Sequence, residues 1–473
     1  MAVLLLALAL RLLAMLPVNF HHPDEVWQYL EPAYHLAFGH WVVAWEYRDG
    51  IRTWLIPAML AGPMWLGNLI DPGSQLYLTL PRLLLVLLSL SIVVSATMMG
   101  LRLSRLHAAM AGLVMATWAE LLYFSSRAMS EPVSVALFLP AALLLTGERE
   151  RRSRMSYLAA GILLGLCFSV RFQLAPALAV LALWACGARW RAWSWLVAGA
   201  LLGLGLDAVV DALVGGHPPL RWIYENFRIN LVEKKSASFG TEPWYWYLQQ
   251  IGGLWKYTSL VLVPLIFLGA RRYPVLLAVA LVNVLAHSLI PHKEYRFILL
   301  SAVLLVLLAA IGSADLMLRW AHGDQQKLRR NVLIGIAFWC LASWLLAYHS
   351  PLKRFWKSGR PLIEAMQLAG ADPKACGLAL YQPPYPLTAN YVYYHRDTPI
   401  YLFNTPEDRG AAMRYRGAFD TVLSLPGVGA LSPEYALLGC TSKEYCVYRR
   451  PGECSGTVPE DYDGNVALER LGK

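Results

Sequence analysis

Long apolar segments recur along the first three quarters of the chain, and no other feature limits the fold as strongly. Each is about 15 to 22 residues long, close to the length that a helix needs to cross the hydrocarbon core of a bilayer. We place them near residues 2–18, 76–100, 108–124, 132–146, 157–170, 174–188, 193–213, 255–271, 274–291, 297–317 and 331–348. The sequence therefore predicts a polytopic α-helical membrane protein with about eleven transmembrane helices.

Composition supports this fold class. Hydrophobic types make up 57% of the 473 residues and charged types only 15%, too few to cover a soluble globule of this size. The formal charge of +10 fits cytoplasmic loops that face phospholipid headgroups, so we expect membrane lipids as partners and no nucleic acid. Residues 1–16 lack the early basic residues and cleavage site of a signal peptide, and we interpret them as a retained first helix.

The basic residues collect in alternate loops, which predicts the topology. They cluster at Arg102 and Arg105, 148–154, Arg189 and Arg191, Arg271 and Arg272, and 319–330. The positive-inside rule makes these loops cytoplasmic. The outer set is then 19–75, 125–131, 171–173, 214–254, 291–296 and everything after 349. Residues 1–349 are thus predicted to form a membrane domain with large outer loops at 19–75 and 214–254.

After residue 350 the composition becomes more polar and strand-like runs appear, which predicts a small extracytoplasmic α/β domain over 350–473. The predicted strands are 377–381, 399–403, 420–424 and 445–448, and helical patches lie at 386–395 and 405–416. Four of the seven cysteines fall in this region: Cys376, Cys440, Cys446 and Cys454. An even set in one polar stretch indicates disulfides in an oxidising compartment, and the sequence leaves all three pairings open.

The stretch 19–28 places two histidines and two acids directly after the first apolar segment. A helix that begins near Pro23 explains one acid, because acids suit the positive end of a helix dipole. It does not explain His21, His22, Asp24 and Glu25 together. On such a helix Asp24, Gln28 and Glu31 would share one face, forming a polar strip beside the membrane.

Cationic side chains lie in the other outer loops. The loop 290–297 contains His292, Lys293 and Arg296, although the positive-inside rule disfavours basic residues there. Binding of a lipid phosphate explains them, and attraction to headgroups with a local Lys–Glu pair is the alternative. Arg127 and Arg171 are further candidates on this side. A membrane-embedded arginine is costly unless it is paired, and we expect the acids at 207 and 211 to neutralise one of these bases.

Aromatic residues are concentrated in the two large outer loops, among them Trp45, Trp244 and Trp246. Tryptophan suits the membrane interface, so these residues are either interfacial anchors or the walls of a cleft that holds a sugar. The stretch 45–52 surrounds Gly50 with Glu46, Arg52 and other charges, either as a solvated turn or as part of that cleft.

These features together describe a sugar transfer from a lipid-phosphate donor. A carboxylate is available as a base, and cations are available to stabilise a departing phosphate. The chain contains no nucleotide-binding fingerprint. We therefore expect an enzyme that needs no cofactor and no metal.

Three motifs resemble a known family. His22-Pro23-Asp24-Glu25 with Trp27 and Gln28, the stretch 45–52, and His292-Lys293-Glu294 with Arg296 and Phe297 are similar to signature loops of the glycosyltransferase family twenty-two mannosyltransferases. Within that family the third mannosyltransferases of GPI-anchor synthesis are the most similar. The loop 238–247 resembles a further family stretch, with Phe239, Glu242 and Tyr245 in place of a tyrosine and two histidines.

The resemblance implies a GT-C fold and an inverting transfer of mannose from a polyprenyl- or dolichyl-phosphate mannose to a lipid-linked glycan, giving an α-mannoside. Asp24 would be the base, with Glu25 as the second candidate, and His292, Lys293 and Arg296 would hold the donor phosphate. We add Arg127 and Arg171 to that set, and assign the acceptor and sugar to His22, Gln28, Trp45, Glu46, Arg52, Trp244 and Trp246. The active site would face the periplasm from a bacterial inner membrane, or the lumen from the endoplasmic reticulum.

Three other interpretations remain. The same fold could transfer another polyprenyl-phosphate sugar, such as arabinose or glucose. A transporter or flippase would place its charges at mid-membrane and show repeated halves, whereas most charges here fall in outer loops. A membrane scaffold would leave the cluster around Asp24 unexplained.

Overall fold

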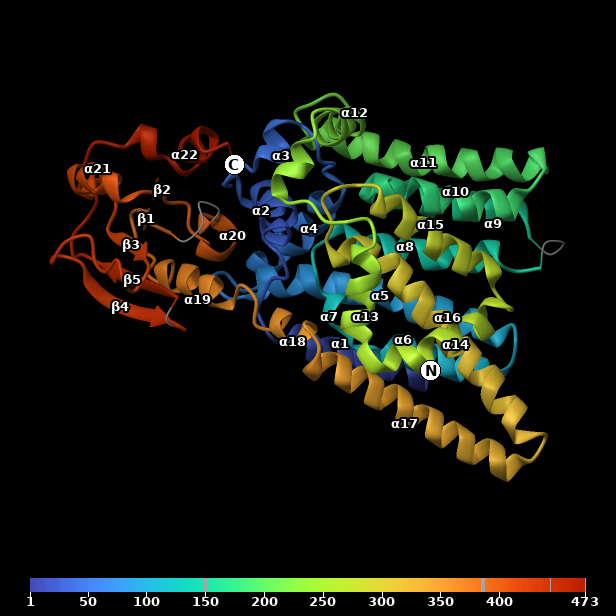
Figure 1. Cartoon of the computed structure of the whole chain (residues 1–473). Coiled ribbons are helices and arrows are strands. Elements are labelled where there is room, and N and C mark those ends of the chain that lie inside the picture. The colour runs from blue at the N-terminus through green and yellow to red at the C-terminus, as the bar shows by residue number, and fades with distance from the viewer. Residues whose placement is uncertain (149–151, 384–387, 443, 473) are drawn as a thin grey trace. The chain divides into compact units, whose positions relative to one another are not determined.

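The computed structural model describes residues 1–148, 152–383, 388–442 and 444–472, and it divides into two compact units (Figure 1). Unit 1 consists of Met1–Pro17, Thr53–Ile56 and Leu78–Arg354. Unit 2 consists of Val18–Arg52, Pro57–Tyr77 and Phe355–Lys473. The first outer loop thus groups largely with the C-terminal part, while the domain boundary at residue 350 stays a prediction.

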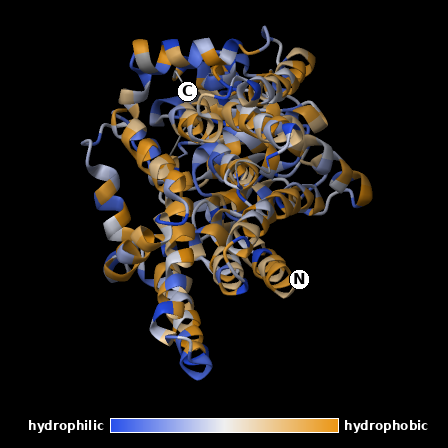
Figure 2. Ribbon diagram, turned by 90° about the vertical axis from the view of Figure 1, so that its right-hand side faces the viewer, coloured by the Kyte–Doolittle hydropathy of each residue, from blue (hydrophilic) through white to orange (hydrophobic). Residues whose placement is uncertain are grey.

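Unit 1 is helical, and each of the eleven predicted apolar segments overlaps at least one of its helices. They are α1 (Ala2–Met15), α5 (Leu76–Leu101), α6 (Arg105–Thr117), α7 (Ala119–Phe124), α8 (Ser130–Leu145), α9 (Arg154–Val170), α10 (Ala175–Cys186), α11 (Trp190–Val214), α12 (Arg221–Phe227), α13 (Trp246–Trp255), α14 (Ser259–Ala270), α15 (Pro274–Ser288), α16 (Leu299–Ala321), α17 (Gln325–His349) and α18 (Leu352–Phe355). Figure 2 shows hydrophobic residues along most of the helical ribbons. Among the described residues, five helical stretches are long and apolar enough to cross a membrane, and six shorter apolar helices accompany them.

Two predicted outer loops contain apolar helix. Helix α4 (Leu55–Ile70) lies within the predicted loop 19–75, and α13 extends the apolar stretch Trp246–Ala270 into the predicted loop 214–254. Helix α4 has Pro63 in its interior, and glycine and proline weaken the helix signal of a sequence. Trp246 and Tyr247, in the aromatic loop predicted to lie at the membrane interface, form the first turn of α13.

Glycines set the close packing of two helix pairs. Helices α9 and α11 lie side by side (Figure 1), and a Cβ added at Gly161 or Gly199 would stand only 2.2 or 2.1 Å from the carbonyl oxygens of Leu196 or Leu158. Helices α14 and α16 approach in the same way at Gly269 and Gly312. Small residues let helix backbones approach closely in a membrane, where lipid removes most of the hydrophobic drive for association.

The predicted segment 108–124 is broken into two helices. Trp118 adopts an extended conformation between α6 and α7, with φ −64° and ψ 124°. The break frees carbonyls at the end of α6, and Arg11 from α1 donates to Met115 O at 3.0 Å and to Ala116 O at 3.3 Å. Unsatisfied backbone groups are costly in apolar surroundings, so this fully buried arginine compensates for the break.

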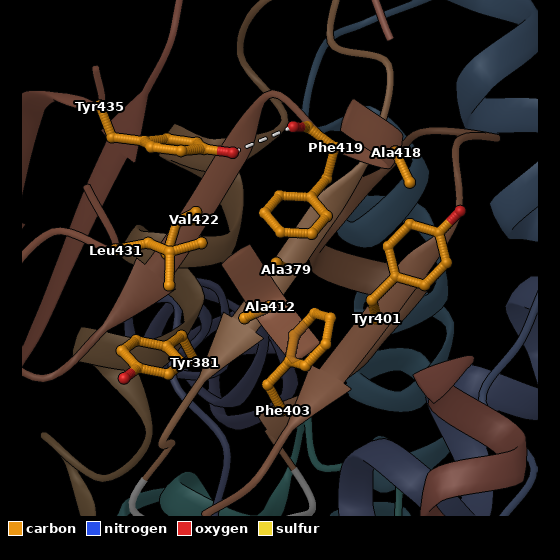
Figure 3. Close-up of a cluster of buried hydrophobic side chains, with 10 residues drawn as sticks. All are labelled: Ala379, Tyr381, Tyr401, Phe403, Ala412, Ala418, Phe419, Val422, Leu431 and Tyr435. Atoms are coloured by element: carbon orange, nitrogen blue, oxygen red, sulfur yellow. Dashed lines mark hydrogen bonds between the residues drawn. The ribbon is translucent and has the colours of Figure 1, made fainter. Parts of the chain in front are cut away.

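Unit 2 contains a mixed five-stranded sheet in the order β2-β1-β3-β5-β4. Strands β1 (Leu378–Tyr381), β2 (Ile400–Phe403) and β3 (Thr421–Ser424) are parallel, whereas β5 (Tyr445–Arg449) is antiparallel to β3 and β4 (Ala436–Thr441). The other helices of this unit are α2 (Glu31–Phe38), α3 (Trp45–Arg48), α19 (Arg360–Ala369), α20 (Tyr391–Tyr394), α21 (Arg409–Arg414) and α22 (Gly464–Arg470). Aromatic side chains such as Tyr401, Phe403 and Phe419 fill the core against the sheet (Figure 3).

The four predicted strands are present, and the sequence missed β4. Most of β4 is exposed, and its register shifts between Leu437 and Gly439, so it lacks the alternating pattern of a half-buried strand. Helices α20 and α21 fall within the two predicted helical patches, of which residues 386–387 lie outside the described part of the chain.

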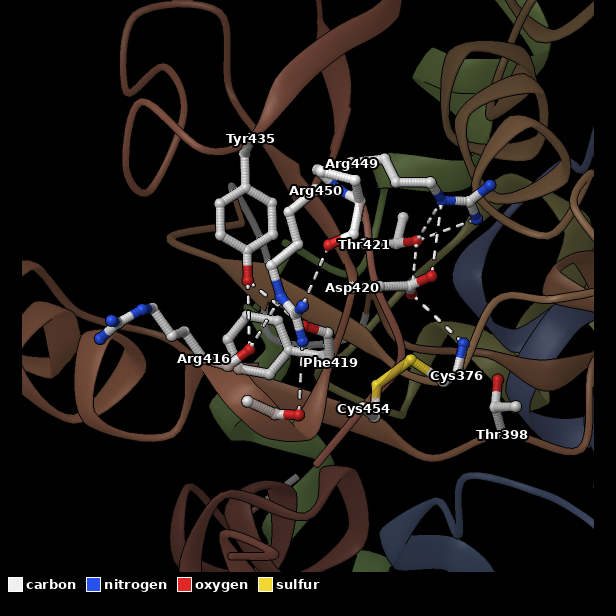
Figure 4. Close-up of a disulfide and its surroundings, with 12 residues drawn as sticks. Cys376, Thr398, Arg416, Phe419, Asp420, Thr421, Tyr435, Arg449, Arg450 and Cys454 are labelled. Atoms are coloured by element: carbon white, nitrogen blue, oxygen red, sulfur yellow. Dashed lines mark hydrogen bonds and ion pairs between the residues drawn. A yellow bond between two sulfur atoms is a disulfide. The ribbon is translucent and has the colours of Figure 1, made fainter. Parts of the chain in front are cut away.

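Both possible disulfides of the C-terminal region are formed. Cys440 and Cys446 join β4 to β5, and Cys376 joins Cys454 across 78 residues. Beside the second bond, the Asp420 carboxylate accepts the Cys376 N–H at 3.3 Å (Figure 4). The sequence predicted the disulfides but could not choose among three pairings.

The glycine contact of α11 gives a matched test. Gly199→Ala places a methyl group against the Leu158 carbonyl, and overpacking of this kind costs about 1–3 kcal/mol. Gly205→Ala, in the same helix but with open space around it, is expected to stabilise by roughly 0.5–1 kcal/mol through helix propensity. Thermal unfolding of the two variants in detergent measures the difference. Equal effects would contradict the packing described here.

Candidate functional site

The two adjacent acids of the first motif have different surroundings. Glu25 is buried at the start of a π-helical turn, Glu25–Leu30, and its Oε2 accepts the His21 N–H at 2.7 Å. The side chain of Asp24 is 24% exposed, and its Oδ1 lies 3.2 Å from His22 Nδ1. One acid thus supports the backbone, while the other reaches solvent beside a histidine.

Behind this pair, Gln28 connects the first motif to the second. Its Nε2 donates to Glu46 Oε1 at 2.7 Å, and its carbonyl accepts the Tyr47 hydroxyl at 2.7 Å. Burial raises the pKa of Glu46, and the nearby charge of Arg52 opposes that rise. Trp45, half-buried, begins α3 directly before Glu46. The structure therefore brings together the predicted residues at 28, 46 and 52.

Glu31 does not join this group, so the predicted polar strip does not form. It is fully buried and accepts backbone N–H groups from Val42 at 2.9 Å, Tyr391 at 2.7 Å and Val392 at 2.9 Å. The π-helical turn before α2 changes the register on which the shared face depended. Burial raises the pKa of Glu31 to about 7.

In unit 1 a chain of ion pairs connects three predicted segments. Arg171 donates to Glu131 Oε1 at 2.8 Å, and Arg296 Nε lies 3.8 Å from the same oxygen. Arg296 also holds Glu294 through both carboxylate oxygens, at 2.7 and 2.9 Å. Arg171, Arg296 and Glu131 are buried. Two predicted phosphate ligands, Arg171 and Arg296, thus lie close together. Glu131 contacts both of them, and Glu294 contacts Arg296.

The loops 240–242 and 290–293 are fastened to each other. The Lys293 ammonium donates to Ile290 O at 2.5 Å and Glu242 O at 3.0 Å, and the Glu242 N–H donates to Pro291 O at 2.9 Å. His292 bridges the two loops, with Nδ1 3.2 Å from Gly240 O and Nε2 3.2 Å from Glu294. The hydrogen bond to Glu294 raises the pKa of His292, whereas burial lowers that of Lys293.

Three further predicted residues belong to unit 1. Arg127 is buried, donates to Tyr123 O at 3.3 Å and stacks over the Tyr123 ring at 4.5 Å. Trp244 is 68% exposed, and Trp246 is half-buried in the first turn of α13. Trp244 lies edge-on to Tyr245, with ring centroids 5.7 Å apart.

The acids of α11 do not neutralise a predicted base, which corrects our expectation. Asp207 accepts from the Thr53 hydroxyl and from Trp222 Nε1, and Asp211 accepts the backbone N–H groups of Trp54 and Leu220. Both carboxylates are buried, and they hold the segments 53–54 and 220–222 against α11. The sequence indicated that these acids need partners, but not which ones.

Glu120 was missed by sequence reasoning. This buried carboxylate accepts from Trp118 Nε1 at 2.7 Å, from Trp255 Nε1 at 3.4 Å and from the Tyr295 hydroxyl at 2.5 Å. Through the hydrogen bond from Tyr295, Glu120 helps to position the motif 292–297. Its signal was an acid inside a predicted apolar segment, which is costly without a specific role.

Comparison with known proteins defines the family. Residues 2–370 match the model of the Alg9-like mannosyltransferase family. The chain belongs to this family. The predictions of a mannosyltransferase family member and of a GT-C fold are therefore confirmed.

Individual relatives agree with this family. A GPI mannosyltransferase 3 of Yarrowia lipolytica is 26% identical, over 82% of this chain and 74% of that protein. A human GPI alpha-1,2-mannosyltransferase 3 is 26% identical, but the match spans only 62% of this chain and 54% of the relative. A Drosophila melanogaster GPI mannosyltransferase 3 is 28% identical, over 73% and 61%.

Solved structures share the fold. The apo crystal structure of ArnT from Cupriavidus metallidurans superposes with a TM-score of 0.62 at 14% identity, over 97% of this chain and 98% of that chain. The ArnT structure bound to undecaprenyl phosphate gives 0.61 at 13% identity, over 97% and 99%.

Glu31 provides a pH test of unit 2. Its pKa in the folded protein is about 7, above the value of 4.5 for an unperturbed glutamate. The folded state therefore binds more protons than the unfolded state between these values, and stability falls as pH rises from about 4.5 to about 7, by at most ~1.4 kcal/mol per pH unit. Glu31→Gln should lack this component of the pH dependence.

The measurement is the thermal midpoint at pH 5 and pH 8 for wild type, Glu31→Gln and Glu364→Gln. Glu364 pairs with Arg360 on the exposed face of α19, so its substitution should leave the pH dependence unchanged. An unchanged pH dependence in Glu31→Gln would show that this carboxyl does not titrate as described.

Proposed function

We propose that this chain transfers mannose from a polyprenyl- or dolichyl-phosphate mannose to a hydroxyl of a lipid-linked glycan, with inversion, to give an α-mannoside. Membership of the Alg9-like mannosyltransferase family supports the sugar. The names of the relatives support a GPI-precursor type of acceptor. The undecaprenyl phosphate in one ArnT structure supports a polyprenyl-phosphate donor.

The contrast between Asp24 and Glu25 carries the proposal. Glu25 is engaged with backbone, whereas Asp24 is partly exposed beside His22 and can accept a proton. In the proposed reaction Asp24 takes the proton of the acceptor hydroxyl, whose oxygen forms the new bond to the anomeric carbon. The bond from that carbon to the phosphate oxygen breaks, and the lipid phosphate leaves with the electron pair.

The cationic cluster of unit 1 is proposed to hold that phosphate. Arg296 binds both oxygens of Glu294, and a phosphate offers a guanidinium the same paired oxygens. Arg171 lies on the other side of Glu131 and adds a second buried cation. His292 gains its proton more readily because of Glu294. Lys293, whose ammonium also donates to loop carbonyls, and Arg127 are proposed to complete the set that binds the donor phosphate.

The acceptor and the sugar are proposed to contact the aromatic and polar residues of the outer segments. Gln28 and Glu46 are buried next to the motif of Asp24, with the half-buried Arg52 close by, and Trp45 adjoins them. The exposed ring of Trp244, with Trp246 beside it, offers a surface on which a sugar can stack. Because Phe239, Glu242 and Tyr245 replace other residue types of the family, the acceptor is expected to differ in detail from that of the relatives.

We propose that the motif of Asp24 and the C-terminal sheet both lie outside the cytoplasm. The two disulfides and the arginine-rich loops at the opposite helix ends support this orientation. In inside-out vesicles, external protease should spare the part after residue 350, and in right-side-out vesicles it should cleave it. The reverse result would invert the topology.

Asp24→Asn tests the base. The variant should lose transfer by about 10²–10⁴-fold, because the amide cannot take the proton. Binding of polyprenyl-phosphate mannose and thermal stability should stay close to wild type. Glu25→Gln is the matched comparison, with lowered stability and a smaller loss of transfer. The assay is run in EDTA, in which wild-type activity should persist. Full activity of Asp24→Asn would show that Asp24 is not the base, and Glu25 would become the candidate.

Arg296→Gln tests the phosphate site. Loss of a charged hydrogen-bonding partner of the phosphate should weaken donor affinity by at least roughly tenfold. Arg272→Gln is the control, because Arg272 is also an arginine of unit 1 in a bidentate pair, in its case with Asp315. The measurement is the dissociation constant of a short-chain polyprenyl-phosphate mannose. Equal donor affinity in both variants would remove Arg296 from the donor site.

A further inference from the structure

A cavity of about 450 Å³ lies at the ends of α9, α10 and α11, and its lining includes no residue assigned above to donor, acceptor or catalysis. Of the described residues that line it, four are arginines, three are aromatic and none is acidic. The lining residues are Arg152, Arg154, Tyr157, Arg189, Trp190, Arg191, Ala192 and Trp195. Its basic lining indicates an anionic ligand.

Two helix N-termini meet at this cavity. Along α9 and α11, Gly161 faces Leu196 and Gly165 faces Ala200, so the two helices run in the same direction. Helix α9 begins at Arg154 and α11 at Trp190, and their positive dipole ends therefore add at the same place. Backbone dipoles and arginine side chains here favour negative charge together.

Two of the arginines are held in place by backbone. Arg152 donates to Gly147 O at 2.7 Å and Ala185 O at 3.1 Å, and Arg189 donates to Ala185 O at 2.5 Å. These contacts satisfy carbonyls at the C-terminal ends of α8 and α10, the negative ends of those helices. These contacts fix the two guanidinium groups at the cavity. Arg154 and Arg191 are exposed.

The aromatic residues indicate where the ligand comes from. Arg189 lies over the Tyr157 ring at 5.8 Å, and Arg191 over the Trp190 ring at 5.5 Å. Trp190 is 71% exposed, and Met155 next to Arg154 is 64% exposed, so apolar surface adjoins the cationic site. Tryptophan and arginine side by side at helix ends are typical of the headgroup level of a membrane. A ligand with a phosphate and acyl chains matches both the cationic site and the apolar surface, whereas free phosphate matches only the cationic site.

We propose that this cavity binds the phosphate of an anionic phospholipid at the predicted cytoplasmic face of the membrane. Arg154 and Arg191 bind the phosphate oxygens, Arg152 and Arg189 supply fixed positive charge, and Trp190 lies against the lipid. This site is independent of the proposed mannosyl transfer.

Native mass spectrometry of the full-length protein tests the site. Delipidated protein in neutral detergent is titrated with dioleoyl phosphatidylglycerol, with dioleoyl phosphatidylcholine and with inorganic phosphate. We expect a saturable first adduct with phosphatidylglycerol, bound at least roughly tenfold more tightly than phosphatidylcholine, and no displacement by millimolar phosphate. The double variant Arg154→Gln/Arg191→Gln should lose that preference.

Arg329→Gln/Arg330→Gln is the matched control, because it removes two exposed arginines from the first turns of α17, outside the cavity. It should keep the tight adduct, as should the charge-conserving Arg154→Lys/Arg191→Lys, which also guards against a folding defect. An equal loss in both glutamine variants, or no preference in the wild type, would overturn the proposal. Displacement of the lipid by inorganic phosphate would overturn the lipid as the occupant.

Discussion

The buried ion pairs around Glu131 are the interaction on which the proposed donor-phosphate site of unit 1 depends. Glu131 begins α8, Arg171 follows α9, and Arg296 precedes α16, so one carboxylate connects three segments far apart in the sequence. A charge without a partner in this apolar environment would cost several kcal/mol, which fixes the relative positions of the three helix ends. The same arrangement places two guanidinium groups where the donor phosphate is proposed to bind.

The same cost explains other polar residues inside apolar segments. Arg11 satisfies the carbonyls that the break at Trp118 leaves open, and that break brings Glu120 to Tyr295. Asp207 and Asp211 fasten the segments around Thr53 and Leu220 to α11. These side chains are best understood as supports of loops that carry motifs. Their loss should therefore disturb function by way of structure, unlike the loss of Asp24, the proposed base.

Within unit 2, burial and backbone hydrogen bonds also distinguish acids that are neighbours in the sequence. Glu25 and Glu31 are acids in a motif-rich segment, yet both accept backbone N–H groups and stabilise the chain path. Asp24 is left as the more accessible carboxylate of the motif. A sequence pattern that contains several acids thus resolves into structural acids and one candidate base, because burial and backbone hydrogen bonds separate residues that the sequence places side by side.

The sequence by itself determined the membrane-helical class, most of the apolar helices of unit 1 and four of the five strands, because hydrophobic segments and strand runs are local signals. It also identified the motifs at 22–28 and 292–297 and the presence of disulfides. Only the tertiary structure decided the pairing of Cys376 with Cys454, the partners of Asp207 and Glu31, and the separate surroundings of Asp24 and Glu25. These depend on contacts between residues up to several hundred positions apart, and a buried polar group specifies only that it needs a partner, not which one.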